Sequence, residues 1–531
     1  MMNNSLTEYV LIRIVILILH YIGPACSLYA TKLAHRALVS SEWPALSVFQ
    51  IWCVAEAAFY GFFLWYRVHL QREATHPPLR SKAERKALFD KVRGEIHDVE
   101  RFLSGWFRGA RVEDIGRDDA KDFLSWAFWE SRTVREDEAE LEEVTQGVEK
   151  MVGRTFKPGR GTAKSLRLTL DPIEIECRSL LWYTIIMLVD TISHVRLLRY
   201  GMRYYSTLSA TLTVFPPRPL AAVTATSRSP AKSLSYWLRP HTSKTRLPIV
   251  YLHGIGVGLH PHVEFLHELD IALNHSSTED DKVGIMSIEA LQISSRLTHS
   301  IPTRTEFLRQ FTQILEAHSY DRFVLLSHSY GSVHSTYVLT HDALASRVAA
   351  ALFVDPVTIL LHMPDVAYNF TVRKPKHANE WQLWYFASKD PGVAHTLGRH
   401  FFWSENILWR ERIMQLVDSG MRVTVSLGRR DLIVDTPAVG AYLMEHKVPD
   451  PVVVRDGTNE KHMELLDGAP TGEKASREKT ADWKTRPWKG QGLEVLWWDD
   501  QDHAQVFDEA SSRKKLVDVL VEYSKDRKIP S

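Results

Sequence analysis

The stretch that most constrains the fold is residues 323–336, which read FVLLSHSYGSVHST. Four apolar residues, typical of a buried strand, are followed at once by small and polar residues around Ser329, and a helix-like segment begins at Gly331. A sharp strand-to-helix turn of this kind lifts a serine hydroxyl out of a sheet, where a histidine can take its proton. The usual pattern is G-x-S-x-G; here Ser327, which is also small, replaces the first glycine. The stretch therefore predicts an α/β sheet with Ser329 as a nucleophile at its edge.

A second apolar run, residues 247–252, leads into a glycine-containing loop of His253, Gly254, Ile255 and Gly256. Glycines just past a strand let the backbone approach a substrate oxygen closely. Backbone N–H groups aimed at that oxygen form an oxyanion hole, an effect of about 3–4 kcal/mol per donor. We expect the donors to be the amides of Ile255 and of Tyr330, the residue after the nucleophile.

Two later apolar runs end near a candidate acid and a candidate base. Residues 421–427 lead to Asp431, and residues 493–498 lead to His503. The serine, aspartate and histidine then follow one another in the chain order that is typical of α/β-hydrolases, which differs from two other familiar triad orders. In such a triad the histidine activates the serine, and the aspartate orients the histidine.

Two other aspartates stay open as the acid. Asp435 lies one turn beyond Asp431, and Asp355 follows another apolar run, residues 351–354. His328 and His334 flank the nucleophile, but a base on the same elbow cannot easily face the serine hydroxyl. We therefore expect both histidines to be packing or rim residues.

Residues from about 246 to 507 resemble the α/β-hydrolase superfamily, and the segments HGIG, SHSYGS, GRRD and DQDH are similar to those of its ester- and lipid-hydrolysing branch. With its apolar N-terminus and helical region, the chain looks like the membrane-anchored α/β-hydrolase (AB hydrolase-1) domain proteins of fungal genomes. By this resemblance Ser329 would be the nucleophile, Asp431 the acid and His503 the base. The resemblance implies a mostly parallel sheet flanked by helices with a helical cap, and it implies no metal or organic cofactor.

Two apolar segments near the N-terminus, residues 9–30 and 46–66, are each long enough to span a membrane. The residues that follow the second segment are rich in Arg and Lys, which favours a cytoplasmic location for the downstream chain, with an endomembrane such as the endoplasmic reticulum among the candidates. One span with one interfacial helix, and two buried helices of a soluble protein, stay open as alternatives. A third apolar run, residues 180–198, carries Asp190, His194 and Arg196, so we expect a buried or membrane-surface helix rather than a span.

The length of 531 residues exceeds one ordinary domain. We predict a membrane anchor over residues 1–75, a helical region over 76–205 and a catalytic domain over 206–531, with a cap insertion at about 360–415. The insertion and its flank contain eight aromatic residues, which either form the cap's own core or bind an apolar acyl chain: Trp381, Trp384, Tyr385, Phe386, Phe401, Phe402, Trp403 and Trp409.

Charge and cysteine content exclude some classes of protein. The balance of 65 basic and 64 acidic residues gives no case for nucleic acid, and three cysteines form no disulfide framework. The sequence predicts a membrane-anchored serine hydrolase that cleaves a carboxylic ester of a hydrophobic, lipid-like substrate. An acyltransferase that uses the same acyl-serine, and a catalytically silent membrane scaffold of the same fold, are the alternatives.

Overall fold

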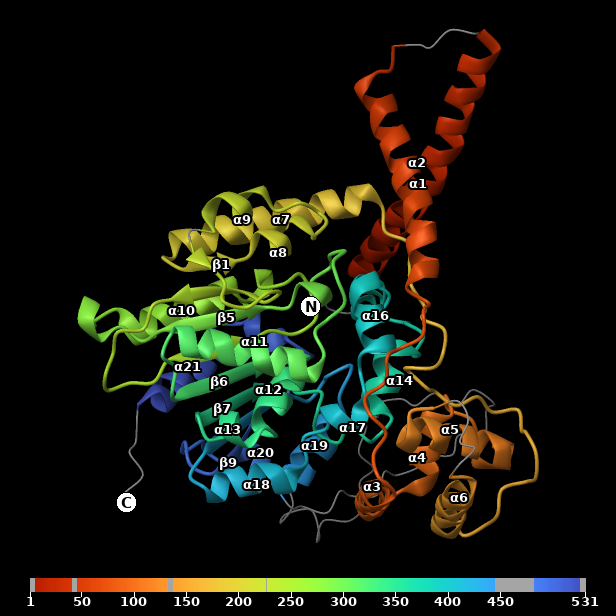
Figure 1. Ribbon diagram of the computed structural model, residues 1–531, viewed down its shortest axis with the longest axis vertical. Coiled ribbons are helices and arrows are strands. Elements are labelled where there is room, and N and C mark those ends of the chain that lie inside the picture. Colours follow the sequence, from red (N-terminus) through yellow and green to blue (C-terminus); the bar gives the residue numbers. More distant parts are fainter. Residues whose placement is uncertain (1–4, 41–44, 132–136, 226, 445–481, 526–531) are drawn as a thin grey trace.

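A nine-stranded, mostly parallel sheet lies at the centre of the molecule (Figure 1). The computed structural model describes residues 5–40, 45–131, 137–225, 227–444 and 482–525. Its strands are β1 (Arg203–Ser206), β2 (Ser227–Arg228), β3 (Ser235–Arg239), β4 (Ile249–Leu252), β5 (Ile285–Glu289), β6 (Phe323–His328), β7 (Val348–Val354), β8 (Arg422–Gly428) and β9 (Leu493–Trp498). Every strand run expected from the sequence is therefore a strand of this sheet.

The order of the strands across the sheet is β2-β1-β3-β5-β4-β6-β7-β8-β9. Strand β3 pairs antiparallel with β1 and β5, whereas the pairs β5–β4, β4–β6, β6–β7, β7–β8 and β8–β9 are all parallel. The carboxyl ends of parallel strands meet at one edge, where α/β proteins build their sites. Strand ends of this kind precede Ser329, Asp355 and the loops that carry Asp431 and His503.

Helices cover both faces of the sheet, because successive side chains of each strand point to opposite faces. On β4, Ile249 and Tyr251 pack into one core cluster with α10 (Val263–Asn274) and α21 (Ala510–Ser524). Val250 and Leu252 pack into the other with α11 (Arg304–Ala317) and α12 (Gly331–Leu339). Apolar residues on both faces explain why the buried strands are continuous apolar runs.

The chain between β7 and β8 forms the predicted cap from short helices. They are α14 (Asp365–Thr371), α15 (Ala378–Leu383), the π-helix η5 (Trp384–Ser388), α16 (Pro391–Arg399), α17 (Trp403–Asn406) and α18 (Arg410–Asp418). The remaining short helices of the catalytic region are η2 (His260–His262), η3 (Glu279–Asp281), η4 (Leu291–Ile293), α13 (Asp342–Ala345), α19 (Thr436–Leu443), α20 (Asp482–Thr485) and η6 (Gln505–Phe507).

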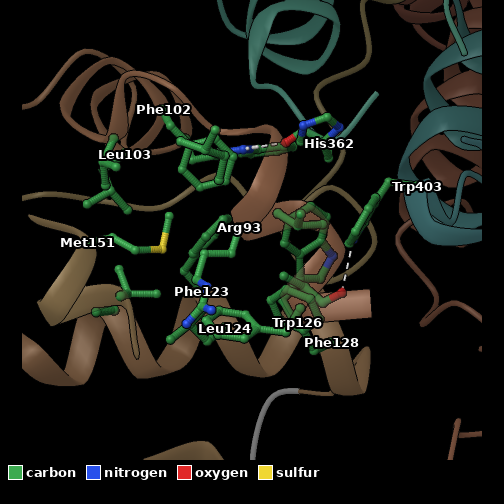
Figure 2. Close-up of a pocket in the computed structure, with 18 residues that line it drawn as sticks. Arg93, Phe102, Leu103, Phe123, Leu124, Trp126, Phe128, Met151, His362 and Trp403 are labelled. Atoms are coloured by element: carbon green, nitrogen blue, oxygen red, sulfur yellow. Dashed lines mark hydrogen bonds between the residues drawn. The ribbon is translucent and has the colours of Figure 1, made fainter. Parts of the chain in front are cut away.

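A helical region packs against the cap. It contains α3 (Lys82–Glu95), α4 (Val99–Trp106), η1 (Val112–Asp114), α5 (Arg117–Trp129) and α6 (Glu138–Val152). Two indole N–H groups join it to the cap: Trp106 donates to the His362 carbonyl at 3.1 Å, and Trp403 donates to the Ala127 carbonyl at 3.0 Å. Figure 2 shows the apolar cavity between these residues, which is lined by side chains of the helical region together with His362 and Trp403.

The predicted N-terminal spans lie in two long helices that project as a hairpin from the rest of the molecule (Figure 1). They are α1 (Leu6–Ser40) and α2 (Val48–His69). By length and composition both could cross a membrane, and so could α7 (Leu180–Arg199). Two short helices, α8 (Leu208–Leu212) and α9 (Pro219–Thr224), follow α7 near the β1 edge of the sheet. The division of the chain into three domains stays a prediction.

Candidate active site

Ser329 occupies a strained turn between β6 and α12. Its φ of +50° lies in the left-handed region, which costs a non-glycine residue roughly 1–2 kcal/mol. Backbone bonds hold the turn: the Ser329 N–H donates to the Val354 carbonyl at 2.9 Å, and the Ser332 N–H and hydroxyl donate to the Ser329 carbonyl. This is the sharp strand-to-helix turn, or elbow, that the sequence predicts around Ser329.

Two glycines let neighbouring backbone approach the elbow. A Cβ atom on Gly331 would lie 2.0 Å from the Leu252 carbonyl oxygen, and one on Gly254 would lie 2.7 Å from the Ser329 Cβ. Ser327, which replaces the first glycine of the usual pattern, is fully buried in β6. Its hydroxyl finds no hydrogen-bond partner among the described residues. The fold thus accepts a small side chain at that position.

His503 joins Ser329 to Asp431 by two hydrogen bonds. Its Nε2 lies 2.8 Å from the Ser329 Oγ, and its Nδ1 lies 2.7 Å from the Asp431 Oδ2. The other carboxylate oxygen of Asp431 accepts from the N–H groups of Ile433 and Val434 at 2.7 and 2.9 Å. These backbone donors fix the carboxylate, which in turn fixes the imidazole ring with its Nδ1 as the protonated nitrogen.

The two other aspartates considered as the acid have different contacts. Asp435 caps α19 by accepting from the Ala438 N–H at 3.1 Å, and it pairs with Arg101 at 2.6 Å. The structure therefore does not bring Asp435 to the histidine. Asp355 lies beneath the histidine loop and accepts from the N–H groups of Ala504 at 2.9 Å and Gly428 at 3.3 Å.

Three buried carboxylates surround the imidazole and set its charge. Burial alone would lower the pKa of His503, but Asp431, Asp355 and Asp502 together raise it to about 9. Burial raises the pKa of Asp355 to about 7, and burial together with Asp431 raises the pKa of Asp502 to about 6. The cluster therefore favours the protonated imidazole, and the neutral form becomes more populated as the pH rises.

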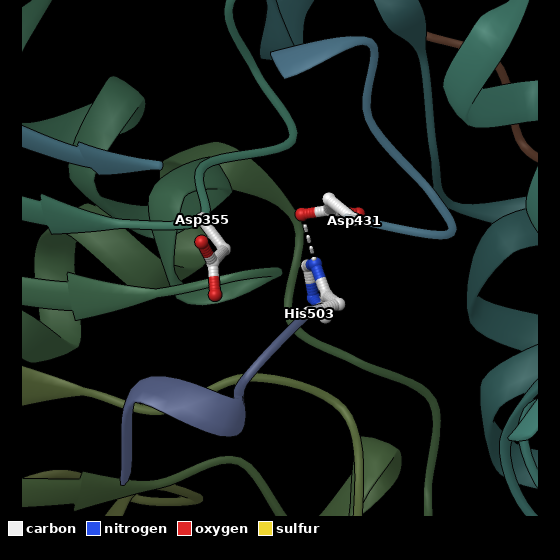
Figure 3. A group of neighbouring side chains, drawn as sticks. All are labelled: Asp355, Asp431 and His503. Carbon is white, nitrogen blue, oxygen red and sulfur yellow. Dashed lines mark hydrogen bonds and ion pairs between the residues drawn. The ribbon is translucent and has the colours of Figure 1, made fainter. Parts of the chain in front are cut away.

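Asp355, Asp431 and His503 each have one nitrogen or oxygen atom within 4.8 Å of the others, a spacing that could hold a metal ion (Figure 3). Both imidazole nitrogens already have partners, namely Asp431 and Ser329. Binding an ion here would require the imidazole to give up one of these contacts. The donor set thus fits a hydrogen-bonded chain better than a metal site.

The expected oxyanion donors border the space above the serine. Neither the Ile255 nor the Tyr330 N–H donates a hydrogen bond to any residue that the structure describes. His253 fixes the preceding loop, because its Nδ1 lies 2.8 Å from the Gly254 carbonyl and its Nε2 accepts from the Ala290 N–H at 3.0 Å. Burial lowers the pKa of His253, in keeping with a neutral ring that donates and accepts one bond each.

An apolar pocket opens over Ser329. Its walls come from the oxyanion loop, the cap, the acid loop and the chain before α7, and they are lined by Leu168, Ile255, Tyr330, Val357, Val366, Ala367, Phe370, Thr371, Leu397, Phe401 and Ile433. Of the eight aromatic residues expected in the cap, Phe401 alone lines this pocket among the described residues. Others contact different parts of the molecule. Trp403 packs on Phe128 of the helical region, and the guanidinium of Arg13 on α1 lies over the ring of Trp381.

The two flanking histidines behave as packing residues, as expected. His328 and His334 are both buried, and burial lowers the pKa of each. His334 stacks on Phe307 with ring centroids 4.4 Å apart. Neither ring hydrogen-bonds to the Ser329 hydroxyl in the described structure.

Two site residues were not foreseen from the sequence. Asp502 accepts from the N–H groups of Leu432 and His503, so it ties the acid loop to the base. Asn379 of the cap donates to Asp502 at 2.9 Å and connects the cap to the same pair of loops. Nothing in the sequence pairs a residue of the cap with the DQDH segment, since the contact joins residues 123 positions apart.

No family model matches the chain, and no curated protein matches it either. Solved structures with some similarity include a membrane phospholipase A, described as a bacterial virulence factor, at 10% sequence identity, over 65% of this chain and 94% of that one, with a TM-score of 0.37. A carboxylesterase of the thaumarchaeon Nitrososphaera gargenis shares 14% identity over 56% and 98% of the two chains, with a TM-score of 0.33. The haloalkane dehalogenase of Agrobacterium tumefaciens shares 12% identity, over 56% of this chain and 95% of that one, with a TM-score of 0.33.

The assignment of the fold rests on the strand order, the elbow and the chain order of the three hydrogen-bonded residues. Resemblance to fungal proteins is not borne out by these comparisons. The region from β3 to α21 has the α/β-hydrolase fold.

Proposed function

We propose that the chain is a membrane-anchored serine hydrolase that cleaves a carboxylic ester with a hydrophobic acyl group. The observation that carries this proposal is the hydrogen-bonded chain from Asp431 through His503 to Ser329, placed at the floor of an apolar pocket. A serine hydroxyl is a weak nucleophile at its ordinary pKa and needs such a base.

The proposed reaction follows from these contacts. The Ser329 Oγ attacks the acyl carbon while His503 Nε2 takes its proton, and Asp431 stabilises the imidazolium that forms. The N–H groups of Ile255 and Tyr330 donate to the developing oxyanion, assisted by the positive end of α12. The imidazolium then gives its proton to the leaving alcohol. A water molecule, deprotonated by His503, releases the acid from the acyl-serine.

Two features support a lipid-like substrate. The pocket is lined almost entirely by aliphatic and aromatic side chains, which suit an acyl chain. The α1–α2 hairpin is long and apolar enough to hold the catalytic domain at a membrane. The basic residues after α2 support a cytoplasmic position for that domain.

Turnover of a series of p-nitrophenyl esters, from acetate to decanoate, tests the proposal on full-length protein in detergent. We expect the longer esters to be preferred, and Ser329→Ala to lose at least about 10³-fold in kcat. A folded wild-type protein without turnover of any ester, or full activity in Ser329→Ala, would refute the proposal. Adding an acceptor alcohol distinguishes a transferase, because a new ester would then replace the free acid as the main product.

A further inference from the structure

Helix α7 turns two of its polar side chains, Asp190 and His194, toward the catalytic domain. Asp190 pairs with Arg218 at 2.8 Å and also with Arg296, and both arginine side chains are almost completely buried. One turn further on, the His194 Nε2 lies 2.6 Å from the Thr224 hydroxyl on α9. These bonds hold one face of α7 against the catalytic domain.

The opposite face of α7 is apolar and uncovered. Ile185, Leu188 and Ile192 recur at intervals of three and four residues, so they form one stripe on the helix. Soluble proteins place apolar side chains inward and charges outward. Helix α7 is apolar on both faces, because Trp182, Ile186 and Leu197 are buried while the stripe is exposed. Such a helix fits a position whose outer surroundings are not water.

The next two helices carry further exposed apolar side chains. Leu208 and Leu212 lie one turn apart on α8, and Val223 lies on α9, which contacts both α7 and α8. We call these six residues, Ile185, Leu188, Ile192, Leu208, Leu212 and Val223, the apolar plate. Their exposed fractions run from 39% to 81%, far above those of the core. Exposed apolar side chains gathered on neighbouring helices in this way mark an interaction site.

The plate is continuous with the hairpin. Figure 1 shows α7, α8 and α9 together on the side of the domain from which α1 and α2 project. The buried carboxylate of Glu56, on α2, accepts from the N–H groups of Leu180 and Leu181 at 2.8 and 3.2 Å. The first turn of α7 is thereby fixed to the middle of α2.

The uncharged part of α1 that continues beyond its contacts with the domain indicates where the membrane surface lies along the hairpin. Leu19 of α1 belongs to a core cluster shared with the domain, and His20 pairs with Glu176 at 3.1 Å. Residues 21–40 continue α1 beyond these contacts and reach about 30 Å at about 1.5 Å per residue. Only the first part of that length, residues 21–31, is uncharged, and Lys32, His35 and Arg36 follow it. The hydrocarbon core therefore takes up residues 21–31, and the bilayer surface on the domain side would lie close to the level of His20. The first turn of α7 contacts α2 just beyond that level.

We propose that the apolar plate lies in the interfacial layer of the leaflet from which the hairpin enters, as a second membrane contact. Helix α7 then lies along the membrane and does not cross it, since Asp190 and His194 bind it to the domain on one side. The hairpin and the plate together fix the orientation of the catalytic domain on the lipid surface. The proposal does not depend on the chemistry of Ser329.

Depth measurements on spin-labelled protein test this inference. Single cysteines replace Ile185, Leu188, Ile192, Leu212 and Val223 in full-length protein whose Cys26, Cys53 and Cys177 are alanine. Each variant is labelled with a nitroxide in phosphatidylcholine nanodiscs. Ala343→Cys on α13, also exposed but away from the hairpin in Figure 1, is the control. Oxygen should relax the labels on the plate more effectively than a water-soluble nickel complex, and the reverse should hold at Ala343.

Each other outcome contradicts the proposal. Labels on the plate that behave like the one at Ala343 would place it in water. A steady change in depth from Ile185 through Leu188 to Ile192 would indicate a spanning α7, because a helix along the surface keeps them at one depth. Dipolar broadening between labels would indicate a second copy of the chain on the plate. A double variant, Leu208→Glu with Leu212→Glu, should reduce the depth of a label at Leu188, whereas Ala343→Glu should not.

Discussion

The carboxylate of Asp355 accepts a hydrogen bond at 2.9 Å from the backbone N–H of Ala504, the residue directly after His503. Asp355 itself has a left-handed backbone, with φ of +44° at the end of β7, and so does Ala504, with φ of +68°. The contact joins the middle of the sheet to the histidine loop. Asp355 therefore both positions the loop and adds negative charge beside the imidazole.

Asp355→Asn should move the pH dependence of ester hydrolysis to lower pH. The neutral imidazole is the active base, and the pKa of His503 is raised to about 9, so wild-type kcat/KM should fall as the pH drops below that value. Removing one negative neighbour destabilises the imidazolium and lowers its pKa, by roughly one unit. The pH profile of kcat/KM for a soluble ester measures the shift. An unchanged profile in a variant with wild-type thermal unfolding would show that Asp355 does not influence His503.

Asp431→Asn and Asp435→Asn should differ sharply in activity. Of the two aspartates, Asp431 is the one that hydrogen-bonds to His503. Its amide variant should lose on the order of 10⁴-fold in kcat, because the amide favours the wrong tautomer of the histidine. Asp435→Asn should keep kcat within a few-fold, because that side chain pairs with Arg101 and caps α19. Similar losses in both variants would mean that the assignment of the acid is wrong. The comparison uses kcat, measured as the rate of ester hydrolysis at saturating substrate and divided by the concentration of folded protein.

Gly331→Ala and Ser327→Ala should differ in their effect on stability, although both change a small residue of the elbow. The added Cβ of Gly331→Ala would overlap the Leu252 carbonyl oxygen, so we expect destabilisation of about 3 kcal/mol or more, or failure to fold. Ser327→Ala removes a buried hydroxyl without a partner among the described residues, and it should change the free energy of unfolding by less than about 1 kcal/mol. Chemical denaturation of the purified proteins checks both values. A well-folded Gly331→Ala variant would contradict the close packing at the elbow.

Val366→Phe should shorten the acyl chain that the pocket accepts. Val366 lies on α14 among the residues that line the pocket over Ser329, and it is only partly buried, so a larger side chain can enter the free space. We expect kcat/KM for decanoate to fall at least about tenfold, and that for acetate to change little, because a few methylenes carry about 1–3 kcal/mol of discrimination. Equal losses for both esters would indicate a general disturbance of the site.

The sequence predicted the parts of the site that depend on local pattern. Three apolar runs that end a few residues before Ser329, Asp431 and His503 marked three strand ends, and parallel strands bring such ends together at one edge of the sheet. The pattern favoured Asp431 as the acid but left Asp355 and Asp435 open, since Asp355 follows another apolar run and Asp435 lies one turn beyond Asp431. The choice depended on which carboxylate reaches the imidazole and which one meets Arg101, a residue 334 positions from Asp435.

Contacts between distant segments explain what the sequence did not predict. The sequence left open whether the aromatic residues of the cap form its core or bind a substrate. Trp403 packs on α5 and Trp381 contacts α1, and neither partner could be foreseen because both lie hundreds of residues away in the chain. The polarity of α7 argued against a span, but only the ion pairs of Asp190 show which face of that helix is held by the domain.

Mass spectrometry after treatment with a fluorophosphonate probe tests the central claim most directly. The probe forms a covalent bond with a serine hydroxyl that a neighbouring base has activated. We predict one adduct, on the peptide that contains Ser329, in wild-type protein and in Asp435→Asn, and no adduct in Ser329→Ala or His503→Ala. An unlabelled but folded wild-type protein, or an adduct that persists in His503→Ala, would contradict an active Ser329–His503–Asp431 triad.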